Sequence, residues 1–168
     1  MTKVNLVRDE MAFPQVYCVE WLDGHEVTKR RGLAWLIPRP DIIGIDGKAE
    51  FEKLDEGSSQ NLKNRFDWWL RTFGVTKKEY CHGWDENGYE NVWVFKYREH
   101  RIFGFLCHPD EDDPGFVLCV LSCYTIKDGW EADPALKKFM AEFANDETML
   151  KAARNVHVGI ECPHKEKK

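Results

Sequence analysis

The sequence predicts an α+β domain in which helices pack on one face of an antiparallel sheet. Two observations predict this class: β-branched and aromatic runs separated by short polar turns, and segments whose apolar residues recur at helical spacing. The chain has 168 residues, which is the size of one domain. Hydrophobic residues make up 43% and charged residues 32%, a globular composition that excludes a disordered chain, a collagen and a coiled coil.

The N-terminal stretch, residues 1–57, is expected to be a β-rich elaboration. The β-branched and aromatic run at 16–22 predicts a strand, and Asp23-Gly24 after it is typical of a hairpin turn. Residues 32–37 predict the next strand, because the proline that follows cannot donate to a sheet ladder. Residues 42–45 are a short further strand candidate.

Residues 58–161 are the expected α+β core, and 162–168 a flexible polar tail. Ser58 and Ser59 are expected N-caps of its first helix, and Gly74 is the expected stop. Four apolar residues at i, i+4, i+7 and i+11 place one face of this helix in the core: Leu62, Phe66, Trp69 and Phe73.

A β-hairpin is expected over 92–106, with its polar turn at 98–100. The long apolar run at 116–126 predicts a central strand that is buried on both faces. Asp133 followed by Pro134 predicts the start of a helix, and a second helical segment is expected over 147–155. The core therefore reads helix, strand, strand, strand, helix.

Charge and composition also limit the classes of function that this chain can have. Asp and Glu exceed Lys and Arg by 29 to 24, so any contact with nucleic acid must be a local basic patch. No apolar run reaches the roughly 18 residues of a membrane helix, and the first residues lack the apolar part of a secretory signal. These features predict a cytoplasmic protein with no membrane partner, whose six cysteines are reduced.

Basic and aromatic residues gather around the predicted hairpin and at the end of the long strand. They are Lys96, Tyr97, Arg98, His100, Arg101, Tyr124 and Lys127. If the three strands pair in chain order, Lys127 approaches Arg101 at one edge of the sheet. Cations at one edge can bind a phosphate, and RNA carries its own nucleophile in the 2′-hydroxyl, so its cleavage needs no metal. The same Lys and Arg residues are also typical of solvated hairpin ends.

This part of the chain resembles the RelE/HigB-type toxins of toxin–antitoxin systems. The resemblance rests on Val-Phe-Lys-Tyr-Arg-Glu-His-Arg-Ile-Phe-Gly-Phe at 94–105, on the strand that ends at 124–127, and on the helix start at Asp133-Pro134. It covers roughly residues 58–145. It implies helices packed on an antiparallel sheet, mRNA cleavage on the ribosome, and a partner antitoxin. The chain departs from the family in its greater length, its acidity, and Asp128 after Lys127.

The expected function is therefore that of a toxin acting as a metal-independent endoribonuclease, with no cofactor and no binding of DNA by itself. By position in the resemblance, Arg101 and Lys127 would neutralise the phosphate, and Lys96 would assist. His100 or Tyr124 would move the proton, with His108 a further candidate. Arg98 and Tyr97 are the expected RNA contacts. The alternative is a non-catalytic protein-interaction module on the same fold, acting as an inhibitor or a nucleic-acid mimic.

Cysteine and histidine leave two other possibilities. Cys81-His82, Cys107-His108 and the pair Cys162 and His164 supply enough ligands for zinc, but adjacent residues point in different directions. Cys81 and Cys107 are the candidate nucleophiles of a Cys/His hydrolase, yet neither lies in a recognisable signature. We therefore expect no metal.

Overall fold

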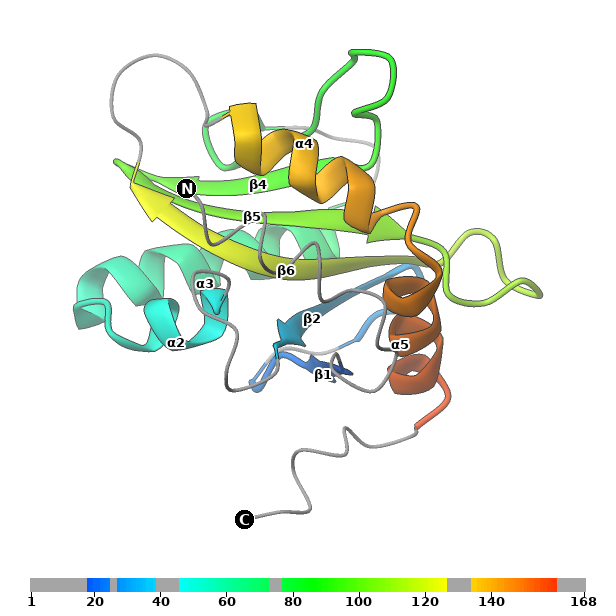
Figure 1. The fold of residues 1–168 in the computed structure, drawn as a ribbon. Helices are drawn as coiled ribbons and strands as arrows, with labels where there is room; N and C mark the ends of the chain where they lie inside the picture. The colour runs from blue at the N-terminus through cyan, green and yellow to red at the C-terminus, as the bar shows by residue number, and fades with distance from the viewer. Residues whose placement is uncertain (1–17, 25–26, 39–45, 73–76, 127–133, 160–168) are drawn as a thin grey trace.

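A six-stranded mixed sheet with helices on both faces forms the framework of the protein (Figure 1). The computed structural model describes residues 18–24, 27–38, 46–72, 77–126 and 134–159. The expected α+β class is confirmed. In chain order the elements are β1 (Cys18–Trp21), β2 (Arg31–Ile37), α2 (Gly47–Glu52), α3 (Glu56–Arg71), β3 (Cys81–His82), β4 (Val92–Tyr97), β5 (His100–Cys107), β6 (Val117–Ile126), α4 (Pro134–Phe143) and α5 (Glu147–His157).

The strands lie in the order β1-β2-β6-β5-β4-β3. Strands β4, β5 and β6 form the expected antiparallel meander. The turn between β4 and β5 is shorter than the expected 98–100, because His100 already pairs with Tyr97 as the first residue of β5. Strands β1 and β2, from the N-terminal stretch, continue the same sheet. One detail of the expected sheet is wrong: β2 runs parallel to β6. The chain between these two strands passes through α2, α3 and three strands, and a long crossover of this kind permits parallel pairing.

Helices cover both faces, whereas the sequence analysis expected them on one. We call the side of the sheet that α2 and α3 cover the α3 face. Its buried cluster includes Phe66, Phe95 and Leu121. We call the side that α4 and α5 cover the α4 face. Its buried cluster includes Phe103 and Leu118. Leu118 and Leu121 are both fully buried although they belong to opposite faces. A central strand that is apolar on both sides requires cover on both sides.

Helices α2, α3 and α5 begin at acidic caps, which are Asp46, Asp55 and Asp146. Asp55 accepts a hydrogen bond from the backbone N–H of Ser58 at 2.9 Å, so α3 begins one turn earlier than expected from Ser58 and Ser59. Ser58 instead lies buried inside the first turn. A side-chain oxygen at the N-cap satisfies an N–H that the helix itself leaves unpaired. The buried face of α3 contains Leu62, Phe66 and Trp69, as predicted.

A β-bulge interrupts the pairing of β5 and β6. Phe103 lies opposite Cys123, but Gly104 lies opposite Leu121, which leaves Ser122 as the extra residue in β6. Residues two apart in a regular strand share a face, yet Leu121 packs on the α3 face and Cys123 on the α4 face. The bulge therefore reverses the facing of the last residues of β6, including Tyr124.

Several expectations concern residues outside the described ranges. These are the strand at 42–45, Phe73, Gly74, Lys127, Asp133 and the tail at 162–168. Cys18 is disulfide-bonded, so the expectation that all six cysteines are reduced is wrong. The free thiols of Cys81, Cys107, Cys119 and Cys123 are all buried. Among the described residues, no helix combines the length and the apolar character needed to span a membrane.

Candidate functional site

The β4–β5 hairpin places Lys96 directly opposite Arg101, and Tyr97 directly opposite His100. Opposed residues of an antiparallel pair share a face, and consecutive residues point to opposite faces. Lys96 and Arg101 therefore lie on the α4 face, in line with the buried pair Val94 and Phe103. The structure brings these two predicted cations together.

The guanidinium of Arg101 is held by the turn of its own hairpin. It donates hydrogen bonds to the backbone oxygens of Arg98, at 2.5 Å, and His100, at 2.9 Å. The chain reverses at Arg98, whose φ is 53°. Burial lowers the pKa of Arg101 from its usual value, but a guanidinium remains charged in proteins. Arg101 is thus a half-buried, permanently positive group with a restricted orientation.

The other predicted residues form a separate cluster on the α3 face. His100 Nδ1 lies 2.7 Å from the hydroxyl of Tyr124, and the His100 ring stacks on Tyr97 with 6.4 Å between centroids. Burial, and then the charges of two glutamates, raise the pKa of Tyr124. The guanidinium of Arg65 covers the same Tyr97 ring at 4.9 Å, and exposed Arg98 lies 5.3 Å from it.

The predicted constellation is therefore divided between the two faces of the sheet. Lys96 and Arg101 lie on the α4 face, and Tyr97, His100 and Tyr124 on the α3 face. The bulge at Ser122 produces the division on β6, because it turns Tyr124 toward His100. Lys127 lies outside the described residues. His108, at the other end of β5, faces the backbone oxygen of Phe116 at 3.2 Å.

A histidine from β3 joins the two cations instead. His82 lies opposite Val94, so it shares the α4 face with Lys96, which is two residues further along β4. Burial lowers the pKa of His82; the hydrogen bond to the backbone oxygen of Gly83 opposes this in part, and the charges of Lys96, Arg101 and Lys78 lower the pKa further. The Nδ1 atom lies 2.8 Å from the backbone oxygen of Gly83 and donates to it. His82 is consequently neutral at pH 7, and its Nε2 carries a lone pair that can accept a proton.

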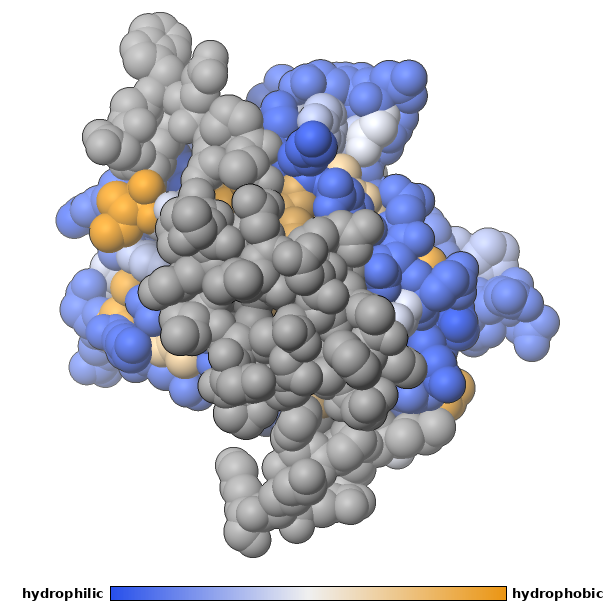
Figure 2. Space-filling view, in the orientation of Figure 1, coloured by the Kyte–Doolittle hydropathy of each residue, from blue (hydrophilic) through white to orange (hydrophobic). Residues whose placement is uncertain are grey.

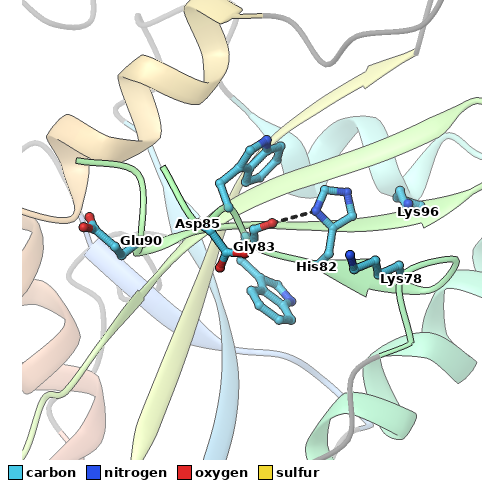
Figure 3. Close-up of a pocket in the computed structure, with 8 residues that line it drawn as sticks. Lys78, His82, Gly83, Asp85, Glu90 and Lys96 are labelled. Atoms are coloured by element: carbon cyan, nitrogen blue, oxygen red, sulfur yellow. Dashed lines mark hydrogen bonds between the residues drawn. The ribbon is translucent and has the colours of Figure 1, made fainter. Parts of the chain in front are cut away.

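A pocket of about 540 Å³ adjoins this histidine (Figure 3). Its walls come from the turn before β3, from β3 and β4, and from the loop between these strands: Lys78, His82, Gly83, Trp84, Asp85, Glu90, Trp93 and Lys96. In Figure 3, Asp85 and Glu90 lie on one side of Gly83, whereas His82, Lys78 and Lys96 lie on the other. The pocket therefore has an acidic end and a basic end.

Helix α4 holds the loop that forms one wall. Lys137 pairs with Glu86 at 3.0 Å, and its ammonium lies 5.4 Å from the centre of a Trp84 ring and 5.0 Å from that of Tyr89. Trp84 also stacks on Phe103, with centroids 6.1 Å apart. These contacts give the pocket a wall that is fixed in the folded protein.

The buried cysteines are poorly suited to nucleophilic catalysis. Burial raises the pKa of both Cys81 and Cys107 to about 12, so both are protonated thiols at neutral pH. Within the described ranges, no three His, Cys, Asp or Glu side chains gather closely enough to hold a metal ion. Cys162 and His164 lie outside those ranges.

From the sequence, His82 is a candidate only for zinc binding. Strand β3 has two residues, which is too short to show any alternation. Lys78, Asp85 and Glu90 belong to no motif. The signal that joins them to Lys96 is the pairing of β3 with β4, which local sequence patterns do not contain. Comparison with protein-family models, curated proteins and solved structures gives no match to this chain.

Proposed function

We propose that this protein is a metal-independent endoribonuclease with the cellular role of a RelE/HigB-like toxin. In this role it acts in the cytoplasm on mRNA bound to the ribosome, and a partner antitoxin silences it. The observation that carries the proposal is the common placement of Lys96, Arg101 and neutral His82 on one face at one end of the sheet.

These three groups match the needs of RNA cleavage by the 2′-hydroxyl. His82 Nε2 accepts the proton of the 2′-hydroxyl, whose oxygen attacks the adjacent phosphorus. The bond to the 5′-oxygen breaks, and that oxygen takes a proton from water. The products are a 2′,3′-cyclic phosphate and a 5′-hydroxyl. Lys96 and Arg101 stabilise the negative charge that develops on the phosphate in the transition state.

One further feature supports the toxin role. The element order α3, β3, β4, β5, β6, α4 contains the helix, three strands and helix expected for the RelE-like part of the sequence, with the two-residue strand β3 added. Large apolar side chains that are exposed within the described residues are Val27, Ile126 and Val158, which belong to three separate segments. The described surface in Figure 2 is mostly hydrophilic, with small apolar patches. On the face shown, the described residues therefore present no extensive apolar interface, either to an antitoxin or to another protein partner.

Cleavage of a labelled single-stranded RNA by the purified protein in EDTA tests the proposal, with and without ribosomes programmed with mRNA. We expect Lys96→Ala and Arg101→Ala each to lower the rate about 10²- to 10³-fold, while circular dichroism shows an unchanged fold. Lys151→Ala, which removes an exposed cation on α5, is the matched control and should cleave at the normal rate. Full activity of both site variants would refute the assignment.

Two histidine variants distinguish the faces of the sheet. His82→Gln should abolish cleavage, whereas His100→Gln should retain it, because His100 faces away from Lys96 and Arg101. The reverse result would return proton transfer to the α3 face. Since the pKa of His82 is lowered, the rate should rise with pH at values below 6.5 and be level above 7.

Expression in cells tests the biological role. Induction of the intact protein should arrest growth with accumulation of mRNA fragments, and the Lys96→Ala/Arg101→Ala double variant should not. Soluble, folded protein that neither cleaves RNA nor arrests growth would favour the alternative, a non-catalytic interaction module.

A further inference from the structure

The pocket beside His82 has the composition of a nucleobase site. Single-stranded RNA bases bind to proteins by stacking on indole rings, and Trp84 lies beside His82 on the α4 face, with 4.8 Å between their ring centroids. Trp93 also lines the pocket, but its ring packs with Trp69 on the α3 side. Gly83 allows the close approach of Trp93: a Cβ at this position would lie only 3.0 Å from the Trp93 ring. A volume of about 540 Å³ also lies within the usual range of small-molecule sites.

The acidic end of the pocket restricts which base can enter. Carboxylates only accept hydrogen bonds, so the edge that faces Asp85 and Glu90 must carry N–H donors. Glu90 is already oriented, because its Oε1 accepts the backbone N–H of Gly88 at 2.9 Å. Guanine presents two adjacent donors, N1–H and the 2-amino group. Adenine and cytosine place an acceptor nitrogen beside their amino group, and uracil has carbonyls on both sides of its single N–H.

The basic end of the pocket indicates which phosphate of a bound RNA would lie next to His82 and Lys96. His82 lines the same pocket as the two carboxylates, and Lys96 is beside it (Figure 3). The 2′-hydroxyl nearest to a bound base is the one on its own ribose. With the base at Asp85 and Glu90, that hydroxyl and the 3′-phosphate next to it extend toward His82 and Lys96.

We infer that this pocket binds the guanine base on the 5′ side of the scissile bond, so that the enzyme cleaves after guanosine. The inference rests on the proposed ribonuclease function and names the base that the same site reads. Asp85 and Glu90 determine the specificity, and Trp84 contributes affinity without selecting among the bases.

Calorimetric binding of nucleoside 3′-monophosphates tests this directly, because these probes are not cleaved. We expect guanosine 3′-monophosphate to bind at least about tenfold more tightly than the inosine compound, which lacks only the 2-amino group. Asp85→Asn and Glu90→Gln should each reduce this difference. Both residues are exposed, so these variants should fold normally. Glu111→Gln, in an exposed loop beyond β5, should leave the preference unchanged.

Equal affinity for the guanosine and inosine compounds would overturn the inference, as would a preference that persists in both acidic-residue variants. Cleavage of RNA without preference for guanosine would refute the pocket assignment and leave the proposed function standing. Selective guanosine binding by a protein that does not cleave RNA would support the pocket and refute the nuclease function.

Discussion

Replacing Gly104 by alanine tests the close approach of β5 and β6 at the bulge. A Cβ at this position would lie 2.4 Å from the backbone oxygen of Val120 and 3.0 Å from the Cα of Leu121. Ordinary contact begins at 3.4 Å, so the two strands would have to separate by about 1 Å. The atoms in the way belong to the backbone of a central strand and cannot rotate aside. We therefore expect Gly104→Ala to lower the free energy of unfolding by about 2–3 kcal/mol.

Urea denaturation followed by tryptophan fluorescence measures this loss, since the chain has seven tryptophans. Gly57→Ala is the matched control. Its Cβ would have its nearest contact at 3.5 Å from the Asp55 carboxylate, and alanine is favoured over glycine in a helix by up to about 1 kcal/mol. The control should be as stable as the native protein or more stable. A Gly104→Ala variant with the native midpoint would show that the strands do not approach this closely.

Three further predictions concern the core and the buried titratable groups. Phe66→Ala removes a fully buried ring that contacts Phe95 at 4.9 Å between centroids, and should cost about 3–5 kcal/mol in urea denaturation. Cys81 and Cys107 should react with iodoacetamide at pH 8 about a thousandfold more slowly than in urea, because a pKa of about 12 instead of 9.0 lowers the thiolate fraction by that factor. Similar rates in both conditions would contradict this. The pKa of His82 is lower in the folded protein than in the unfolded chain, so the unfolded chain binds the proton first as the pH decreases below about 6.5. The free energy of unfolding should therefore fall over this range, and His82→Gln should lose this part of the pH dependence.

Much of the fold follows from local patterns. The helical spacing of Leu62, Phe66 and Trp69 predicts the face of α3 that is buried. The hairpin of β4 and β5 follows from two apolar runs around a polar turn, and the long apolar run of β6 predicts burial on both sides. Each signal lies within one segment of the chain, where a side chain's environment repeats with the period of the element.

Short elements and distant pairings were not predictable in this way. Helix α2 has six residues and β3 has two, and neither is long enough to show a period. The parallel pairing of β2 with β6 joins residues that lie more than eighty positions apart in the sequence. Such contacts depend on how whole elements pack.

The sequence by itself determined the α+β class and the main strands and helices of the core. The opposition of Lys96 to Arg101 came from the structure, because the expected turn at 98–100 would have placed Tyr97 opposite Arg101, and the turn that forms is one residue shorter. The tertiary structure decided the composition of the candidate site. One extra residue in β6, Ser122, turns Tyr124 to the α3 face, and the pairing of β3 brings His82 beside Lys96. A strand places its side chains alternately on two faces, so a single bulge or a new strand pairing changes which functional groups meet.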